Sequence, residues 1–388
     1  MIRVLHIMPS YGGGIGSFIV NIVRSLEEPD IVNDIASFTD YPNFYKAEFE
    51  NKGGRTITLK QIRLKRIFEN IREIRKVIKK GKYDIVYLHA TDVSALWFST
   101  WARTCGIKRI IVHSHQTNHN NNNNWFHGLK FKLYRYLTVT VATQLSSCSK
   151  MASVFRFGSK QVKQHNVMHI PNSINIRSYI NEISDNEKKQ IRLEFGLSSD
   201  DIFIGHIGRF DPQKNHTFML RIIKRMKERG IRFKWIFIGE GAEFEEIKKK
   251  AIESNITDFV KFAGRRNDVP KIFKAMDLSV LPSNFEGLPT VAIECQAAGT
   301  PMLLSNTITT ECDMGLDLLR YLSLDDKLDT WVDTILKMSK MKHVSGDKRI
   351  KNITERKFVS NEAAKLFASF IRGDISTYNF EDYKTVLL

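Results

Sequence analysis

The feature that most constrains the fold is a regular alternation of short β-branched segments with longer segments of helical period. In the first half, strands are expected at 3–8, 34–38, 84–89, 109–113 and 166–170, and helices at 15–27, 65–80 and 127–137. In the second half, strands are expected at 202–207, 234–239, 259–264, 278–282 and 301–305, and helices at 214–228, 243–253, 288–298 and 325–340. This alternation is typical of βαβ units. The sequence therefore predicts an α/β chain with two Rossmann-like, doubly wound parallel-sheet domains.

The length of 388 residues fits two such domains and a short tail. We expect an N-terminal domain at 1–172 and a second domain at 173–358, joined by a polar linker around 175–200. The segment 360–373 has an amphipathic pattern and predicts a helix. We expect residues 359–388 to pack back on the N-terminal domain.

Charge is distributed very unevenly along the chain. The net charge is +17, and residues 51–165 hold 22 Lys and Arg against 4 Asp and Glu, whereas the remainder holds 37 against 38. A localised basic field indicates a polyanionic partner: anionic lipid, a phosphorylated small molecule or nucleic acid.

Several protein classes are not indicated by the sequence. No stretch approaches the ~18 consecutive apolar residues of a membrane-spanning helix. The N-terminal segment lacks the apolar core and cleavage site of a signal peptide. The four cysteines are far apart and form no C-x-x-C pair, which favours reduced thiols. The sequence predicts a cytoplasmic protein, and the basic field leaves open a peripheral position on the inner face of the membrane.

A glycine-rich loop, with Gly12, Gly13, Gly14 and Gly16, follows the first predicted strand and opens a helix. Glycines allow backbone N–H groups to approach a ligand closely, and a helix N-terminus favours phosphate. The pattern is not G-x-G-x-x-G, and no acidic residue clearly ends the second strand, so NAD binding is not predicted. A plain strand-to-helix turn is the alternative interpretation.

The segment GRFDPQKN, residues 208–215, follows the first strand of the second half. Its Arg209 and Lys214 are placed where parallel sheets bind ligands, at the carboxyl end of a strand. A guanidinium and an ammonium together suit a diphosphate. Solvated surface cations are the alternative.

Two glutamates, Glu286 and Glu294, are spaced E-x7-E in FEGLPTVAIECQAAGTP, residues 285–301. Glu286 is expected in a strand-to-helix loop with Pro289 at the first helical position, and Glu294 within an almost wholly apolar helix. A charge on such a helix needs a partner, which argues against two solvated acids. Paired carboxylates here suit the hydroxyls of a sugar and a ribose.

Together these segments resemble glycosyltransferase family 4, retaining enzymes of the GT-B fold that use nucleotide sugars. The resemblance covers 200–312, with GRFDPQKN, IFIGEG, FVKFAGRRNDV and the E-x7-E segment in order, and also 1–30 and 109–175. Bacterial enzymes of capsule and exopolysaccharide assembly are the most similar members. The resemblance implies two domains that face each other across a cleft.

The resemblance also implies the roles of the charged residues. Arg209 and Lys214 hold the donor diphosphate and neutralise the leaving group, so both act in catalysis. Glu286 contacts hydroxyls of the donor sugar and is also expected to be catalytic, and Glu294 binds the ribose. His115, the fourth residue expected to be catalytic, points at the donor sugar, although His113 fits the same motif position, and either histidine could instead be structural.

The remaining implied donor contacts are mostly backbone groups. Gly14 and Gly16 approach the diphosphate from the N-terminal domain, and Gly264 and Arg265 line the base. The backbone near sugar and phosphate is that of Phe285, Gly287 and Leu288.

The expected reaction transfers a hexosyl or N-acetylhexosaminyl group, with UDP as the carrier that the resemblance implies. The cations and helix N-termini stabilise the departing diphosphate. The chain has no strand-ending D-x-D motif and no evident carboxylate nucleophile, so we expect metal-independent, same-face attack with no cofactor beyond the donor. The donor sugar, its base, the acceptor, the linkage and the oligomeric state stay open.

The basic third is expected to serve the acceptor. A helix over 60–82 carries an aliphatic stripe, and aromatic residues interleave with cations near 125–136. The residues are Ile62, Ile67, Ile71, Ile74 and Ile78 in the stripe, and Trp125, Phe126, Lys130, Phe131, Lys132, Tyr134, Arg135 and Tyr136 in the second set. Such faces suit an anionic membrane with a lipid-linked or oligosaccharide acceptor. Packing of the stripe on the sheet is the alternative.

Three other functions are weighed against this one. A GT-B epimerase or phosphorylase is disfavoured by the E-x7-E spacing and by the lack of a cofactor-lysine signature. A nucleic-acid-binding protein rests on charge alone, without a recognition module, so nucleic acid is not an expected partner. A degenerate, non-catalytic subunit is disfavoured by the intact Arg209, Lys214, Glu286 and Glu294.

Overall fold

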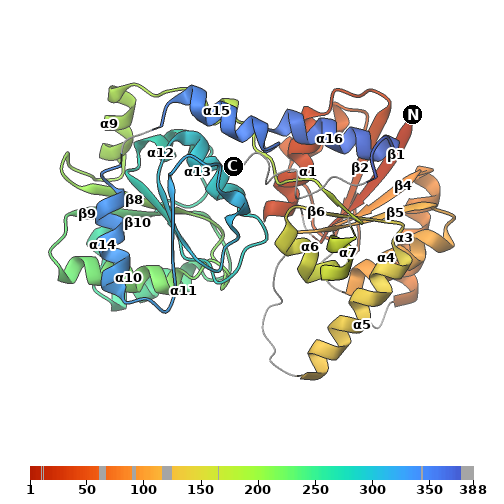
Figure 1. Ribbon diagram of the computed structural model, residues 1–388, viewed down its shortest axis with the longest axis horizontal. Coiled ribbons are helices and arrows are strands. Elements are labelled where there is room, and N and C mark those ends of the chain that lie inside the picture. The colour runs from red at the N-terminus through yellow and green to blue at the C-terminus, as the bar shows by residue number, and fades with distance from the viewer. Residues whose placement is uncertain are drawn as a thin grey trace. The chain divides into compact units, whose positions relative to one another are not determined.

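A computed structural model describes residues 1–9, 11, 13–60, 67–89, 93–115, 125–164, 166–341 and 344–376. The chain divides into two compact units (Figure 1). Unit 1 consists of Met1–Ser173 together with the chain from Lys357 onward, and unit 2 is Ile174–Arg356. Each unit is a parallel sheet with helices on both faces, so the expected α/β class with two doubly wound sheets is confirmed.

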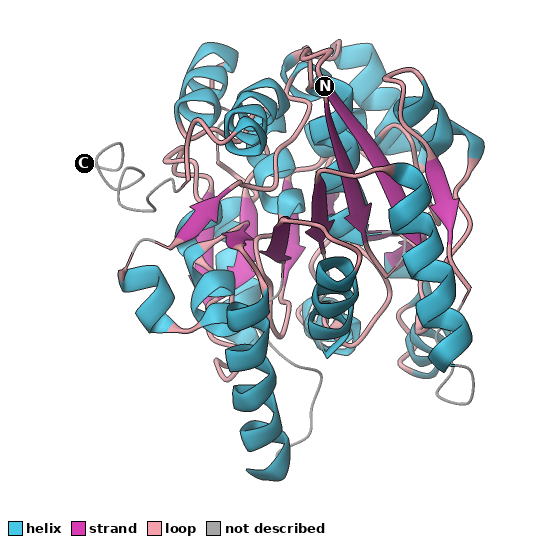
Figure 2. Cartoon of the chain, turned by 90° about the vertical axis from the view of Figure 1, so that its right-hand side faces the viewer, coloured by secondary structure: helices cyan, strands magenta, loops and turns pink. Residues whose placement is uncertain are grey.

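Unit 1 holds a seven-stranded parallel sheet in the order β3-β2-β1-β4-β5-β6-β7. Figure 2 looks onto this side of the chain and shows strands between layers of helices. The strands are β1 (Ile2–Ile7), β2 (Ile31–Ser37), β3 (Thr56–Thr58), β4 (Ile85–Leu88), β5 (Arg109–Ser114), β6 (Gln144–Ser147) and β7 (Val167–His169). The helices are α1 (Gly13–Ser25), α2 (Asn43–Glu50), α3 (Ile67–Gly81), α4 (Val93–Thr104), α5 (Trp125–Val141), α6 (Lys150–Phe157), α7 (Ser159–Lys163) and α16 (Ser360–Arg372). The order reverses between β1 and β4, which makes this pair the switch point of the sheet.

Unit 2 holds a six-stranded parallel sheet in the order β10-β9-β8-β11-β12-β13. The strands are β8 (Ile202–Ile207), β9 (Phe233–Ile238), β10 (Val260–Phe262), β11 (Leu278–Leu281), β12 (Met302–Ser305) and β13 (Leu319–Leu322). The helices are α8 (Arg177–Ile180), α9 (Asp185–Glu194), α10 (His216–Glu228), α11 (Phe244–Glu253), α12 (Val269–Ala275), α13 (Thr290–Ala298), α14 (Leu328–Met338) and α15 (Gly346–Glu355). Here the switch point lies between β8 and β11.

The C-terminal helix α16 completes the core of unit 1. Its Phe367 and Ile371 are fully buried in the same cluster as Phe18 of α1 and Ile35 of β2. Arg109 at the start of β5 donates hydrogen bonds to the carbonyl oxygens of Phe370 and Ile371. The sheet of unit 1 is therefore covered on one face by helices from both ends of the described chain.

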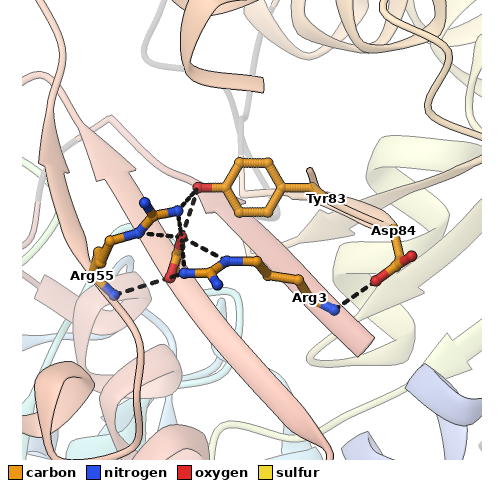
Figure 3. A network of polar contacts seen from close by, with 5 residues as sticks. Arg3, Arg55, Tyr83 and Asp84 are labelled. Atoms are coloured by element: carbon orange, nitrogen blue, oxygen red, sulfur yellow. Dashed lines mark hydrogen bonds and ion pairs between the residues drawn. The ribbon is translucent and has the colours of Figure 1, made fainter. Parts of the chain in front are cut away.

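A buried carboxylate ties the first three strands of unit 1 together (Figure 3). Asp34 on β2 is completely buried, and its oxygens accept hydrogen bonds from the Arg3 and Arg55 guanidinium groups and from the Tyr83 hydroxyl, the last at 2.7 Å. Asp84 accepts the backbone N–H of Arg3 at 2.8 Å. Since each partner comes from a different strand or its flanking residues, this network fixes β1, β2 and β3 relative to one another.

The linker predicted around 175–200 is wrong. This segment folds as α8 and α9 and belongs to unit 2. Ser184 and Glu187 form a reciprocal capping box that begins α9. Arg192 of that helix pairs with Asp277 beside β11 at 3.1 Å. The polar composition that suggested a linker is the exposed side of a short helix whose Ile191 is buried.

The aliphatic stripe of the basic helix packs on the sheet. Ile74 and Ile78 of α3 are buried in the core on the second face of the unit 1 sheet, and Ile71 packs against it. This is the alternative interpretation of the stripe, so α3 does not offer it to a membrane. Ile62 and the tract 118–124 lie outside the described residues, as do the side chains of Ile67, Trp125, Phe126 and Lys130.

Candidate active site

Two loops at the switch point of unit 2 bring the predicted donor residues together. Residues 208–215 follow β8, and residues 282–289 follow its neighbour β11. The Asn284 backbone N–H donates to the Gln213 carbonyl at 2.8 Å, and its side-chain amide donates to the Pro212 carbonyl at 2.7 Å. The two loops therefore form one continuous surface at the carboxyl ends of the strands.

The cations of the first loop differ in environment. Arg209 is 60% exposed, and its Nε lies 3.0 Å from Asp211 Oδ2. Lys214 is only 14% exposed, and its Nζ lies 2.6 Å from Glu286 Oε1. The loop is held by the Lys214 N–H, which donates to the Asp211 carbonyl, and by Asn215, whose left-handed backbone (φ 57°) leads into α10. Arg209 is thus presented to solvent, whereas Lys214 is held in place.

Glu286 is a buried acceptor with several donors. Besides Lys214, its carboxylate accepts hydrogen bonds from Gln213 Nε2 at 2.9 Å and from Ser283 Oγ at 2.7 Å. A solvated acid would have no such shell, so that alternative is wrong for Glu286. The two predicted partners of the donor, Lys214 and Glu286, are in direct contact with each other.

Glu294 lies one turn into α13, which begins at Thr290 with Pro289 as its N-cap rather than its first helical residue. Burial raises the pKa of Glu294 to about 7, while a hydrogen bond from Tyr179 and the charge of Lys214 act in the opposite direction. Burial also raises the pKa of Tyr179. A carboxyl with this pKa changes its charge near neutral pH, and it lies on the same side of the unit as Lys214.

The predicted base and backbone contacts lie on neighbouring segments of unit 2. Gly264 follows β10 with a left-handed backbone (φ 61°), its carbonyl accepts the Gly239 N–H at 2.8 Å, and no atom would meet a Cβ added to it. Arg265 is exposed. In the loop after β11, Phe285 is half-buried, while Gly287 and Leu288 are buried and adjacent in sequence to Glu286.

The predicted glycines and histidines lie in unit 1. Gly14 is exposed on the first turn of α1, with open space around it. A Cβ on Gly16 would lie 1.7 Å from the Tyr11 carbonyl oxygen, so the close approach of the chain itself requires glycine there. Gly12 is outside the described residues, as is the side-chain position of Gly13.

The two candidate histidines lie at the carboxyl end of β5 and are both buried. His113 Nδ1 is 3.0 Å from the Tyr87 hydroxyl and 2.9 Å from Ser146 Oγ. His115 Nε2 is 2.9 Å from His89 Nδ1. Burial lowers the pKa of His115 to about 3 and that of His113 well below its usual range.

Sequence reasoning missed several residues of these sites. Gln213 and Ser283 bond Glu286, and Tyr179 bonds Glu294. Gln213 is part of the motif GRFDPQKN, residues 208–215, whereas Tyr179 lies in the segment predicted as a linker. His6 and His89 form hydrogen bonds that lead to His115, which follows β5. The sequence could have indicated them, because each histidine lies at or near the end of a predicted strand.

The described residues lack two features that would bear on function. They contain no cluster of three or more His, Cys, Asp or Glu side chains arranged to hold a metal ion. They also contain no helix that is long and apolar enough to cross a membrane.

Comparison with known proteins covers both units. Residues 187–353 match the family described as glycosyl transferases group 1, and residues 12–177 match glycosyltransferase family 4. EpsF of Bacillus subtilis (strain 168), named as a glycosyltransferase, is 32% identical over 336 residues, 86% of each chain. The UDP-Gal:alpha-D-GlcNAc-diphosphoundecaprenol alpha-1,3-galactosyltransferase of Escherichia coli is 25% identical over 279 residues, 68% of each chain.

Solved structures share the fold at lower identity. Anabaena HepE in complex with UDP-glucose superposes with a TM-score of 0.75 at 16% identity, over 96% of this chain and all of that one. Sucrose-phosphate synthase of Thermosynechococcus elongatus gives a TM-score of 0.74 at 16% identity, over 96% of this chain and 99% of that one. With two Rossmann-like units, both family matches and a relative similar over most of its length, the chain belongs to glycosyltransferase family 4 and is a glycosyltransferase of the GT-B fold.

Proposed function

We propose that this enzyme transfers a hexosyl or N-acetylhexosaminyl group, with retention, from a UDP-sugar to a lipid-linked acceptor of a cell-surface polysaccharide. The observation that carries the donor part is the joined pair of loops at the β8–β11 switch point. These loops carry Arg209, Lys214 and Glu286, and the half-buried Glu294 lies on α13, the helix that follows the second loop. The UDP-glucose complex of HepE, which shares the fold, supports UDP as the carrier.

The proposed roles follow from exposure and charge. Arg209, exposed and paired only with Asp211 among the described residues, turns toward the diphosphate without loss of a buried contact. Lys214 shares its three N–H groups between Glu286 and a phosphate oxygen. Glu286 accepts from sugar hydroxyls, and Glu294 accepts from the ribose hydroxyls in its ionised form.

The other proposed donor contacts use backbone groups of unit 2 and residues of unit 1. The N–H groups of Phe285, Gly287 and Leu288 meet the sugar and phosphate, and the segment of Gly264 and Arg265 meets the base. Gly14 and Gly16 provide N–H groups at the start of α1 for the diphosphate. His115 meets the donor sugar.

The proposed chemistry stabilises the leaving group. As the bond from the anomeric carbon to the diphosphate oxygen breaks, negative charge grows on that oxygen and an oxocarbenium-like centre forms on the sugar. Arg209 and Lys214 lie where they offset this charge without a metal ion. The acceptor hydroxyl attacks from the same face, and its proton passes to the departing phosphate oxygen. Trapping of a glycosyl–enzyme adduct would contradict this route.

The proposed acceptor side is a membrane surface on unit 1. The diphosphoundecaprenol-linked substrate named for the Escherichia coli relative supports a lipid-linked acceptor. Helix α5 extends away from the sheet (Figure 1), and Leu133 and Tyr136 are exposed on it beside Lys132. Met151 and Val154 are exposed on α6, which packs against α5. We call Lys132, Leu133, Tyr136, Met151 and Val154 the α5 surface. Cations with exposed apolar side chains suit an anionic bilayer.

Isothermal binding to a panel of UDP-, GDP- and ADP-sugars tests the donor. We expect micromolar to millimolar binding of at least one UDP-sugar, lost in Glu294→Ala and Arg209→Ala, together with loss of slow donor hydrolysis. If no sugar nucleotide binds the wild-type protein, the proposal is wrong. Preferred binding of a GDP- or ADP-sugar would overturn the choice of UDP.

Sedimentation with vesicles tests the membrane side. Phosphatidylglycerol vesicles should bind the protein more strongly than phosphatidylcholine vesicles, and added salt should weaken the binding. The pair Leu133→Ser, Tyr136→Ser should reduce it. Phe44→Ser, which changes another exposed aromatic side chain on α2, is the control and should not. Equal binding to both kinds of vesicle, or equal losses in both variants, would remove the membrane from the proposal.

A further inference from the structure

Three histidines and one asparagine form a continuous hydrogen-bonded chain at the switch point of unit 1. His6 lies on β1, His89 directly after β4 and His115 directly after β5. His6 Nε2 is 3.0 Å from Asn33 Oδ1, and His6 Nδ1 is 2.9 Å from His89 Nε2. His89 Nδ1 is in turn 2.9 Å from His115 Nε2. All four side chains are buried.

Each imidazole in this chain carries one proton near neutral pH. Burial lowers the pKa of His6 to about 4 and that of His115 to about 3, and it lowers the pKa of His89 well below its usual range. A neutral imidazole has one N–H donor and one bare nitrogen that accepts. The protons in the chain can therefore be placed by counting.

The direction of the chain follows from its first member. The Asn33 carbonyl oxygen can only accept, so His6 Nε2 must carry the proton and His6 Nδ1 is bare. His89 Nε2 then donates to His6 Nδ1, and His115 Nε2 donates to His89 Nδ1. His115 Nδ1 is left without a proton. One side chain on β2 thus sets the tautomer of a residue two histidines away.

His115 Nδ1 is also the atom at which the chain ends. It is buried, and among the described residues its hydrogen-bonding neighbour is the Asn172 side chain, whereas every other ring nitrogen of the three histidines is paired within the hydrogen-bonded chain itself. The hydrogen bond of the Asn172 side chain raises the pKa of His115 against the effect of burial, and with Nδ1 bare it is the Asn172 amide N–H₂ that donates. A bare, buried ring nitrogen is an acceptor that requires a donor. An acceptor held in one tautomer suits a hydroxyl group of a ligand.

His113 is not part of this chain. Its Nδ1 meets the Tyr87 hydroxyl and Ser146 Oγ, which rotate to donate or accept and so set no tautomer. The rings of His113 and His115 are close, with centroids 4.3 Å apart, but no hydrogen bond joins them among the described contacts. Of the two candidate histidines, only His115 receives a fixed tautomer from its surroundings.

We propose that Asn33, His6 and His89 are positioning residues that fix the tautomer of His115 and present its Nδ1 as an acceptor for a hydroxyl group of the donor sugar. The sugar contact rests on the proposed function, whereas the tautomer does not. In this role His115 stays neutral and binds the sugar, and it neither gives nor takes a proton during transfer.

Nitrogen-15 NMR of the full-length protein labelled at histidine tests the tautomer without any ligand. Long-range proton–nitrogen correlations distinguish a protonated from a bare ring nitrogen, and single His→Gln variants assign the rings. We expect a protonated Nε2 and a bare Nδ1 in His6, His89 and His115. A protonated Nδ1 in His115 would mean that Asn33 turns its amide N–H₂ toward His6, and it would overturn the proposal.

Variants test whether Asn33 sets the tautomer from a distance. Asn33→Leu should turn the His115 signals into a mixture of both tautomers, although residue 33 does not touch residue 115. Ser146→Ala, which removes a hydroxyl from the same buried region but bonds His113, should leave His115 unchanged. Unchanged His115 tautomers in a folded Asn33→Leu protein would contradict the inference. If Asn33→Leu does not fold, the wild-type spectrum still decides.

Adding UDP-glucose, with UDP alone as control, tests the sugar contact. UDP-glucose should shift the His115 Nδ1 resonance, and UDP should not. Binding of UDP-glucose that leaves this resonance unmoved would overturn the sugar contact. Failure of UDP-glucose and all other sugar nucleotides to bind would contradict the proposed function instead, while the ligand-free spectrum would still report the tautomer.

Discussion

At the scale of single residues, Glu294 makes donor binding depend on pH near neutrality. Its pKa is raised to about 7 by burial, and ribose hydroxyls donate best to the ionised carboxylate. The ionised fraction grows about tenfold from one pH unit below the pKa to one unit above it. We therefore expect the affinity for a UDP-sugar, whose diphosphate does not titrate in this range, to rise about tenfold from pH 6 to pH 8, as measured by calorimetry.

The same residue acts on stability with the opposite sign. Because its pKa is higher in the folded than in the unfolded chain, the contribution of Glu294 to stability is largest below pH 4.5 and is lost as pH rises through 7. In Glu294→Gln both pH dependences should flatten. An affinity in this variant that still rises with pH would assign the effect to another group.

Alanine variants of Arg209 and Lys214 should both lose activity but should differ in their unfolding free energy. Arg209 is 60% exposed, so Arg209→Ala should change the unfolding free energy by no more than ~0.5 kcal/mol. It should nevertheless lower kcat/KM by about 10²-fold or more, because the bound donor and the leaving group both lose a cation. Lys214→Ala should lose activity and also ~1–3 kcal/mol of stability, because Glu286 stays buried without its ion pair.

Thermal unfolding and transfer assays on the same preparations check this contrast. The double variant Lys214→Ala, Glu286→Gln should recover part of the stability and none of the activity, because it removes the uncompensated buried charge. A large loss of stability in Arg209→Ala, or none in Lys214→Ala, would show that their surroundings differ from those described.

At the scale of elements, the sequence predicts best where hydrophobic runs are long. Strands β1, β5, β8 and β9 appear within two residues of their expected bounds. Strands β3, β6 and β13 were missed, because their sequences TIT, QLSS and LRYL are short and interrupted by polar residues. Helix α9 was missed because its polar face hides a single buried Ile191. Tyr179, on the preceding helix α8, was not predicted as a site residue because it lies in the same polar segment. Contacts such as Lys214–Glu286 depend on which strands are neighbours, which spacing alone does not reveal.

The edge of the unit 1 sheet depends on Asp34. Replacement by Asn keeps the shape but removes the charge that holds two guanidinium groups. We expect Asp34→Asn to lower the unfolding free energy of unit 1 by ~1–3 kcal/mol, a range that allows for the partial exposure of Arg3 and Arg55. Thermal unfolding measures this. Asp84 is an exposed acid that accepts the Arg3 backbone N–H, and Asp84→Asn should lower the unfolding free energy less. An equal loss in both variants would show that the buried contacts of Asp34 do not stabilise the sheet more than an exposed hydrogen bond does.

At the scale of the whole molecule, the two units share one sheet topology but carry different side chains at the point where the strand order reverses. Each sheet places its polar residues at the strands where the order reverses, β1 and β4 in unit 1 and β8 and β11 in unit 2. Unit 2 offers cations and carboxylates there, whereas unit 1 offers neutral imidazoles and a glycine turn. The basic excess of residues 51–165 belongs to unit 1, whereas the charged loops belong to unit 2.

Helix α16 belongs to unit 1 although it follows unit 2 in sequence, which makes Phe367 a test of how the chain is divided. Its ring is completely buried and lies against His6 and Tyr87, with ring centroids 5.9 and 5.8 Å away. Phe367→Ala should cost ~3–5 kcal/mol in unit 1. Hydrogen exchange by mass spectrometry should then speed up in β1, β2 and β4 and stay unchanged in β8 and β9. Lys365→Ala, on the exposed side of the same helix, should change neither. Faster exchange in both units would mean that they unfold together, and the independent cores described here would not be separate cooperative units.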